Sequence, residues 1–304
     1  MIQLGIFTAY YPYDLKTTAE KIRAQGFNTV QLDLHFKDLD LSAGQITKEK
    51  AKLVSDTFRD HDLPISAISG YTNIVHPDPE HRKQNVEYLK EIIRNARNFG
   101  SKYVISESGT FNPESEWDHD PHNRSEDAYD QVRTVLAELA QTAYDHGATF
   151  LLETYVNNVI GSVRETVRVF NDIRTPGLEL LMDPTNYFDA TNIDDQALVL
   201  NEVFDTLGDR VRIAHAKDVK RAGSDKSEKH ADIGDDDALA SHTFRGVGEI
   251  ELPAAGLGSL DYELYLQRLS ELSPNVPLII EHLDESDIPR AKQFVTDILK
   301  KYTI

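Results

Sequence analysis

Four polar residues, each of a type that binds metal ions in proteins, come directly after short apolar segments of the sequence. Glu153 follows TFLL, Asp183 follows LELLM, His215 follows VRIA and Glu281 follows PLII. Each apolar segment is typical of a strand that is buried on both faces. An ionised carboxylate leaves water only when it is paired or bound to a cation. We therefore expect the four side chains to meet around a shared positive charge.

A divalent cation would hold these side chains together. Three carboxylates about 5 Å apart repel each other by about 3 kcal/mol per pair at an effective dielectric constant of ~20. Three such pairs approach the whole stability of a domain. Oxygen ligands with one imidazole favour Mn²⁺, with Mg²⁺, Co²⁺ and Zn²⁺ as alternatives. The chain contains no cysteine, which excludes thiolate ligands and disulfides.

The elements that must position these residues alternate along the chain. Short apolar segments predict eight strands, which begin near Ile2, Thr29, Pro64, Tyr103, Thr149, Leu178, Val211 and Pro277. Apolar residues three and four apart predict amphipathic helices within residues 15–22, 86–96, 128–143, 163–170 and 291–302. Four helices are expected to end in a left-handed cap, at Gly26, Gly100, Gly147 and Gly208. Strand, helix, glycine and strand in this order are typical of a parallel α/β fold.

Eight such units in 304 residues predict a single TIM barrel domain, a (β/α)₈ barrel spanning residues 1–304. An open doubly wound sheet is the alternative. It is disfavoured because the first strand leads into TAYYPYD and not into a glycine-rich phosphate loop. The charged segment at about 218–248, between the seventh strand and the seventh helix, is longer than an ordinary connection. It is either a solvated surface loop or a lid over the site.

The charge and the N-terminus limit the partners of the protein. Fifty-one acidic and 32 basic residues give a net charge of −19, which repels nucleic acid. No segment approaches the ~18 consecutive apolar residues of a membrane span, and the N-terminal MIQLGIF has no signal-peptide pattern. We expect a cytoplasmic protein that binds neither nucleic acid nor membrane. The sequence is compatible with a homo-oligomer.

The sequence resembles the xylose isomerase-like barrels. The resemblance covers essentially the whole chain, and its marks are LLETY at Glu153, LLMDPTNYF at Asp183, IAHAKD at His215, LIIEHL at Glu281 and the segment GLGSLDYELYLQRL. This family includes sugar-phosphate isomerases and epimerases, ketose 3-epimerases, hydroxypyruvate isomerases and inositol-catabolism enzymes, with endonuclease IV as a distant relative. The resemblance implies a divalent metal held by these four residues, with the two glutamates on opposite sides of a bound sugar.

Two further positions are compared with the family pattern. Arg221 stands six residues after the histidine, at the spacing of an arginine in the ketose epimerases. Asn186 stands where many members have a histidine, so the match to the ketose 3-epimerases is looser here. Asparagine can bind a substrate hydroxyl but is neither an acid nor a base near pH 7.

Other residues near predicted strand ends are candidates for substrate binding. His35 follows the second strand, Tyr71 the third and Glu107 the fourth, while Lys217 stands two residues after the histidine. Trp117, the only tryptophan, could stack on a sugar ring or anchor its own loop. A surface or structural role is the alternative for each of these residues.

The predicted function is the isomerisation or epimerisation of a small sugar, sugar phosphate or related keto-polyol through a cis-enediolate. Glu153 is assigned as the base and Glu281 as the acid or second base. One alternative is a dehydratase that removes water from a keto-inositol on the same scaffold. The others are a non-catalytic sugar-binding protein and an endonuclease IV-like phosphodiesterase, which the net charge disfavours.

Overall fold

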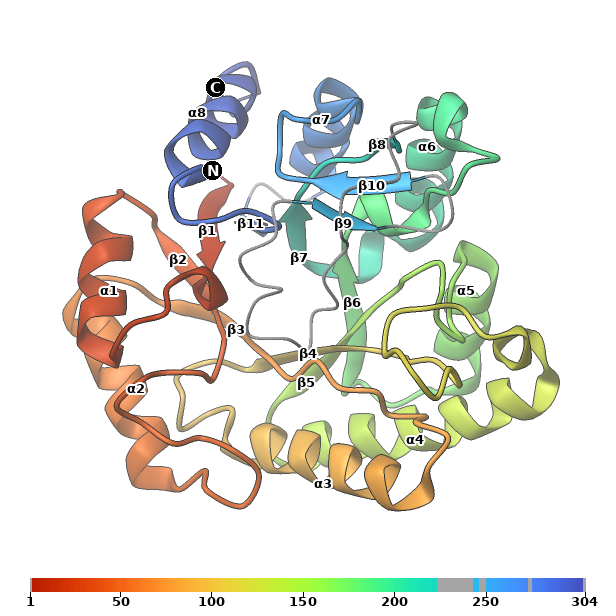
Figure 1. Ribbon diagram of the computed structural model, residues 1–304, viewed down its shortest axis with the longest axis horizontal. Coiled ribbons are helices and arrows are strands. Elements are labelled where there is room, and N and C mark those ends of the chain that lie inside the picture. The colour runs from red at the N-terminus through yellow and green to blue at the C-terminus, as the bar shows by residue number, and fades with distance from the viewer. Residues whose placement is uncertain (1, 223–242, 246–249, 273–274, 303–304) are drawn as a thin grey trace.

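The computed structural model describes residues 2–222, 243–245, 250–272 and 275–302 (Figure 1). Eight parallel strands close into a barrel in the order β1-β11-β7-β6-β5-β4-β3-β2. The barrel strands are β1 (Gln3–Phe7), β2 (Thr29–Leu32), β3 (Ile65–Ser69), β4 (Tyr103–Glu107), β5 (Thr149–Glu153), β6 (Leu178–Met182), β7 (Val211–Ala216) and β11 (Pro277–Ile280). All eight strands lie where the apolar segments of the sequence predict them.

Helices surround the barrel on its outside (Figure 1). The α-helices of the described residues are α1 (Leu15–Ala24), α2 (Lys48–Asp60), α3 (Pro79–Asn95), α4 (Glu126–Asp145), α5 (Val163–Asp172), α6 (Gln196–Leu207), α7 (Tyr262–Leu272) and α8 (Ile288–Leu299). Short 3₁₀ helices are η1 (Thr8–Tyr10), η2 (Pro121–Arg124), η3 (Pro184–Tyr187), η4 (Ile193–Asp195) and η5 (Gly208–Arg210). Strands and helices alternate, which confirms the predicted (β/α)₈ barrel.

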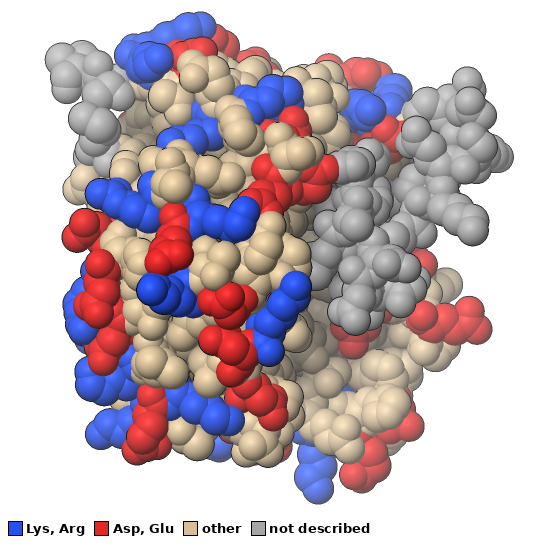
Figure 2. All heavy atoms as spheres, turned by 60° about the vertical axis from the view of Figure 1, so that its left-hand side comes forward, with Lys and Arg blue, Asp and Glu red and all other residues tan. Residues whose placement is uncertain are grey.

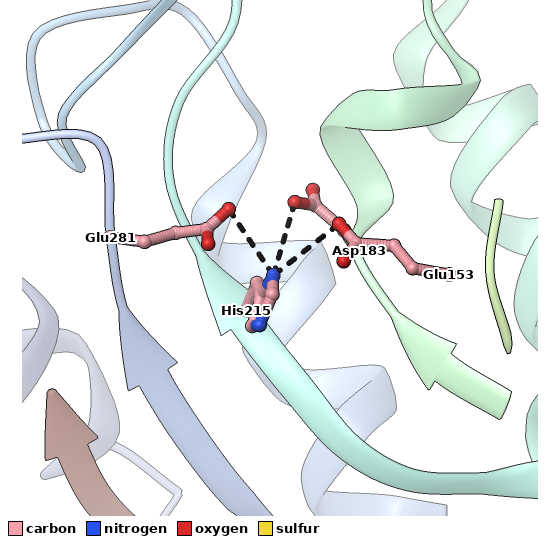
Figure 3. A group of neighbouring side chains, drawn as sticks. All are labelled: Glu153, Asp183, His215 and Glu281. Carbon is pink, nitrogen blue, oxygen red and sulfur yellow. Dashed lines mark ion pairs between the residues drawn. The ribbon is translucent and has the colours of Figure 1, made fainter. Parts of the chain in front are cut away.

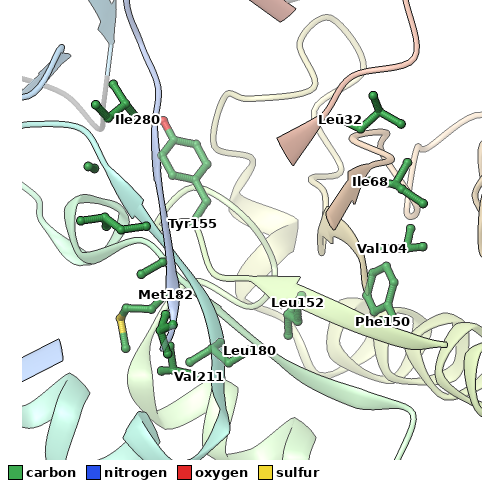
Figure 4. Packing of buried hydrophobic residues seen from close by; sticks show 14 of the residues in the cluster. Leu32, Ile68, Val104, Phe150, Leu152, Tyr155, Leu180, Met182, Val211 and Ile280 are labelled. Atoms are coloured by element: carbon green, nitrogen blue, oxygen red, sulfur yellow. The ribbon is translucent and has the colours of Figure 1, made fainter. Parts of the chain in front are cut away.

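Apolar side chains pack on both faces of the barrel strands. The larger cluster lies between strands and helices and includes Phe150, Leu152, Leu180, Met182 and Ile280 (Figure 4). A smaller cluster consists of Ala67, Ile105, Leu151, Leu181, Ile213 and Ile279. The two clusters alternate along β5 and β6, because successive side chains of a strand point to opposite faces. The smaller cluster is therefore the filling of the barrel itself.

The glycines that end the helices have two different roles. Gly26, Gly100 and Gly147 have φ angles of +74°, +86° and +66°, as the left-handed cap predicts. The prediction is wrong for Gly208, whose φ of −52° is right-handed. A Cβ atom at this position would lie 2.8 Å from the methyl carbons of Leu272 in α7. The close packing of α7 therefore favours a residue without a side chain at position 208.

A second, three-stranded antiparallel sheet follows β7. It consists of β8 (Lys220–Arg221), β10 (Ile250–Pro253) and β9 (Thr243–Arg245), with β10 in the middle. Strands β8 and β9 belong to the segment of about 218–248 that the sequence predicts as a long loop, and β10 directly follows that segment. Most of that segment, residues 223–242 and 246–249, lies outside the described residues, so the lid stays a prediction.

The surface on the side of α1 and α2 carries both signs of charge. Figure 2 shows Lys and Arg side chains interspersed with Asp and Glu across this face. Within the part of the chain that the structure describes, no helix is long and apolar enough to cross a membrane.

Candidate active site

The four predicted ligand residues lie at the carboxyl end of the barrel. Glu153 is the last residue of β5, His215 lies near the end of β7, and Asp183 and Glu281 directly follow β6 and β11. Each stands two positions after a residue of the barrel filling, and residues two apart in a strand share a face. These filling residues are Leu151, Leu181, Ile213 and Ile279. The alternation that fills the barrel therefore also turns all four polar side chains inward.

The side chains converge on the imidazole of His215 (Figure 3). Its Nδ1 atom lies 3.5 Å from Oε1 of Glu153, 3.5 Å from Oδ2 of Asp183 and 3.2 Å from Oε1 of Glu281. One ligand atom from each of the four residues lies within 4.8 Å of the others. All four residues are buried. The structure thus brings together the residues that the sequence places at four separate strand ends.

The atoms at the centre of this cluster fit a divalent cation. Nδ1 of His215, Oδ2 of Asp183 and Oε1 of Glu281 are buried, and within the described residues their polar contacts are ion pairs, including those with one another and with Nζ of Lys217, and not hydrogen bonds. Buried carboxylates that share so few partners are costly. Three carboxylates and one imidazole are ligands that suit hard and borderline divalent ions. The cluster can therefore bind a divalent metal.

Gln31, a residue that the sequence analysis missed, orients the imidazole. Nε2 of His215 lies 2.8 Å from the amide oxygen of Gln31, and the amide nitrogen of Gln31 donates to Oγ of Ser69 at 3.0 Å. Because an amide oxygen only accepts hydrogen bonds, Nε2 carries the proton and the lone pair of the neutral ring is on Nδ1. The sequence feature that could have identified Gln31 is the presence of a glutamine inside the strand TVQL, whose four residues are all buried.

Two predicted substrate-binding residues hold the carboxylate of Glu153. The amide nitrogen of Asn186 donates to Oε1 at 2.8 Å, and the hydroxyl of Tyr71 donates to Oε2 at 2.5 Å. Burial and the negative charge of Glu153 raise the pKa of Tyr71 well above its usual value, so the phenol keeps its proton. Both oxygen atoms of Glu153 are thus fixed in direction.

Lys217 brings a positive charge into the cluster. Its Nζ atom lies 2.7 Å from Oδ2 of Asp183 and 3.2 Å from Oε1 of Glu281, and its side chain is 5% exposed. Burial works against the ammonium form, but the two carboxylates outweigh it and raise the pKa of Lys217 well above its usual value. Burial likewise opposes ionisation of Asp183, yet Lys217 and His215 hold the pKa of this carboxyl far below its usual value.

Glu107 lies beside Glu153, because the two residues are paired in the register of β4 and β5. Burial and the charge of Glu153 raise the pKa of Glu107 well above its usual value, although a hydrogen bond from Asn158 opposes the shift. That bond, from the amide nitrogen of Asn158 to Oε2, measures 2.6 Å. A protonated Glu107 adds no further negative charge next to Glu153.

The other three predicted residues make contacts elsewhere. His35 has a side chain that is 90% exposed, and its Nδ1 lies 2.9 Å from Oδ2 of Asp33. Arg221 on β8 pairs with Asp194 at 2.5 Å. Trp117 is half-buried in the loop after β4, where its carbonyl oxygen accepts a hydrogen bond from Asn157 at 3.0 Å. A role of these residues in substrate binding stays a prediction.

His282 was also missed, and it shapes the backbone next to Glu281. Its φ angle of +61° is uncommon for a residue with a side chain. The backbone N–H of His282 donates to the hydroxyl of Tyr10 at 2.5 Å, and its Nδ1 lies 3.0 Å from the carbonyl oxygen of Leu252. Burial and the charge of Lys217 lower the pKa of His282 to about 4, which keeps the ring neutral. No pattern in the local sequence predicts this backbone conformation.

Comparisons with known proteins agree with this architecture. Residues 19–299 match the family described as "Xylose isomerase-like TIM barrel". None of the curated proteins compared with the chain matches it. A xylose isomerase domain protein from Planctomyces limnophilus is similar in structure, with 21% identity, a TM-score of 0.69 and coverage of 99% of this chain and 98% of that one.

Two further solved structures show the same fold. A D-tagatose 3-epimerase-like protein has 16% identity and a TM-score of 0.70, and the match covers 99% of this chain and 98% of that one. A xylose isomerase-like TIM barrel protein from Mycobacterium smegmatis, solved in complex with magnesium, has 17% identity and a TM-score of 0.69 over 100% of this chain and 97% of that one. With its family match over residues 19–299 and its closed barrel, this chain belongs to the xylose isomerase-like TIM barrel family.

Proposed function

We propose that the protein is a divalent-metal-dependent isomerase or epimerase that acts on a small sugar, sugar phosphate or related keto-polyol. The observation that carries the proposal is the buried cluster of Glu153, Asp183, His215 and Glu281 at the carboxyl end of the barrel. We assign Mn²⁺ as the preferred ion because the ligand set is rich in carboxylate oxygen. When bound, such an ion would polarise a substrate carbonyl and make the adjacent C–H bond more acidic.

The two glutamates supply the acid–base groups. Glu281 approaches His215 from one side and Glu153 from the other (Figure 3). Glu153 is the better oriented of the two, because Tyr71 and Asn186 fix both of its oxygen atoms. We therefore assign Glu153 as the base that removes the proton next to the carbonyl and later releases it to solvent, and Glu281 as the group that passes a proton from solvent to carbon.

The neighbouring polar groups would help substrate bind and react. Removal of a proton from carbon leaves negative charge on the substrate oxygens, and the buried ammonium of Lys217 can stabilise that charge. The protonated carboxyl of Glu107 can donate a hydrogen bond to a hydroxyl of the sugar. These groups suit a polyhydroxylated ketone better than a phosphodiester backbone, which the net charge of −19 would repel.

Proton exchange with solvent is the direct test. Purified protein with Mn²⁺ would be incubated in D₂O with ketoses, sugar acids, sugar phosphates and keto-inositols, and proton NMR would follow each substrate. We expect deuterium at the carbon next to the carbonyl of one substrate class, with formation of its isomer or epimer. Glu153→Gln should lower the rate at least ~10²-fold, because it removes the base and keeps the shape.

A matched control and two other outcomes complete the test. Glu179→Gln makes the same change on β6 but outside the cluster, where Glu179 pairs with Arg212 at 3.3 Å, and should retain activity. A product that absorbs in the ultraviolet would show instead that a β-hydroxyl has left, which is the lyase reaction. Absence of exchange for every compound in the panel, with metal bound, would contradict the proposal.

A further inference from the structure

The ammonium of Lys217 lies on the same oxygen atoms that a metal ion would use. Its two carboxylate partners, Oδ2 of Asp183 and Oε1 of Glu281, are the atoms that face Nδ1 of His215. We propose that Lys217 is an internal competitor for the divalent cation, which neutralises the metal-free cluster and must leave these two oxygens before an ion binds. This inference rests on the metal centre of the proposed function.

Burial explains why the ammonium takes these partners. The side chain of Lys217 is 5% exposed, so water does not solvate its charge. Within the described residues, the carboxylates that form ion pairs with it are those of Asp183 and Glu281. In the metal-free protein these pairs offset the repulsion between the clustered carboxylates. The barrel can therefore fold with its site complete before metal is bound.

The backbone around Lys217 is held in place, so exchange must involve the side chain alone. Lys217 forms a β-bridge with Ala254, and its carbonyl oxygen accepts a hydrogen bond from the hydroxyl of Tyr262 at 2.8 Å. The N–H of Asp218 donates to the carbonyl oxygen of Pro253 at 2.8 Å. These contacts leave the flexible four-carbon stem of the lysine as the part that can turn away.

A divalent ion and the ammonium cannot both keep their contacts. Each would bind Oδ2 of Asp183, and two cations on one oxygen atom repel strongly where water is excluded. Displacement of the lysine therefore costs free energy, which reduces the net binding free energy of the metal. The ligand set should bind metal more weakly in the natural protein than it would without Lys217.

Calorimetric titration of the metal-stripped full chain with Mn²⁺ tests this competition. Lys217→Met keeps most of the length of the side chain and removes its charge, and we expect its dissociation constant for Mn²⁺ to be at least ~10-fold lower than that of the parent. Its metal-free melting temperature should fall, because the carboxylates lose their counter-charge. The melting temperature should recover when Mn²⁺ is added.

Lys220→Met is the matched control. It changes the net charge of the protein equally, but Lys220 pairs with Glu251 at 3.0 Å and its side chain is 40% exposed. Its affinity for Mn²⁺ should equal that of the parent. If Lys217→Met is too unstable to prepare without metal, Lys217→Gln can be titrated in its place, because it also removes the charge and keeps a polar end.

The outcomes separate this inference from the proposed function. Tighter binding by the Lys217 variant, or binding by the variant alone, supports the competition. Equal or weaker binding by the variant, with metal bound by the parent, overturns the competition and leaves the metal centre intact. If parent and variant both fail to bind Mn²⁺, the competition and the metal centre are overturned together.

Discussion

Removal of the metal should lower the thermal stability of the protein, because the ion would offset the repulsion between buried carboxylates. The ligand atoms of Glu153, Asp183, His215 and Glu281 lie within 4.8 Å of one another. At that distance two carboxylate charges repel by about 3 kcal/mol at an effective dielectric constant of ~20. Lys217 offsets part of this repulsion through its two ion pairs. A bound divalent ion would offset more of it, and only in the folded state.

Mass action gives the expected shift in melting temperature. An ion present at 100 times its dissociation constant stabilises the folded state by about 2.7 kcal/mol. An unfolding entropy of ~2.1 cal/mol/K per residue over 304 residues makes each kcal/mol worth about 1.6 °C. Addition of Mn²⁺ to metal-stripped protein should therefore raise the melting temperature by about 4 °C, which differential scanning calorimetry resolves easily. EDTA should reverse the shift.

The rise in melting temperature that Mn²⁺ causes should be larger at higher pH. Burial disfavours the imidazolium form of His215, but Glu281 and Glu153 outweigh it and raise the pKa of the metal-free ring well above its usual value. The stabilisation from this proton is fully present below the unfolded pKa of ~6.5 and is lost as the pH rises through the folded pKa. A metal ion needs the neutral ring, so it competes with the proton and binds more tightly at higher pH.

Asp183→Asn is the control for this experiment, because it removes one carboxylate ligand and keeps the shape of the side chain. The variant should lose most of the response to Mn²⁺. A melting temperature of the parent that is the same in EDTA and in excess Mn²⁺ would refute the reasoning. A response that shrinks from pH 6 to pH 8 would refute the assigned role of His215.

Three further predictions concern residues around the cluster. Gln31→Met should weaken Mn²⁺ binding ~10- to 100-fold in calorimetric titration, because the imidazole loses the acceptor that orients it. Tyr71→Phe should lower the exchange rate of substrate protons with D₂O while the circular dichroism spectrum stays unchanged, because Glu153 loses one hydrogen bond. Gly208→Ala should destabilise the protein by about 1 kcal/mol in urea denaturation, because a Cβ there meets the methyl carbons of Leu272 at 2.8 Å and this side chain must turn aside. A second change, Leu272→Ala, should make the Gly208 substitution less costly, and equal cost in both backgrounds would contradict the assigned contact.

Part of the fold is determined by local patterns in the sequence. The eight barrel strands coincide with short apolar segments, because a strand buried on both faces is apolar at most of its positions. Helices α1, α3, α4, α5 and α8 coincide with predicted apolar periodicity. Apolar periodicity did not predict α2, α6 or α7. In the charged helix α2, the buried residues are Ala51, Val54 and Phe58, which is a short stripe on which to base a prediction.

The sequence by itself also determined which residues form the cluster. Glu153, Asp183, His215 and Glu281 each end an apolar segment, and in a parallel barrel all such ends meet on one face. The inward direction does not follow from the sequence, because the residues one and two positions before each of the four are all buried and apolar. The closed barrel shows that the residues two positions before are the ones that fill its interior.

Only the tertiary structure decided which groups support the cluster. Gln31 contacts His215 across 184 positions of the chain, and Tyr71 contacts Glu153 across 82. The ammonium of Lys217 pairs with carboxylates that follow two other strands, although its place in the sequence fits a surface ion pair equally well. These contacts arise when the barrel closes, and the free energy of each depends on partners that no short stretch of sequence contains. The sequence could therefore name the four clustered residues, while the closed barrel determined the charges and hydrogen bonds that surround them.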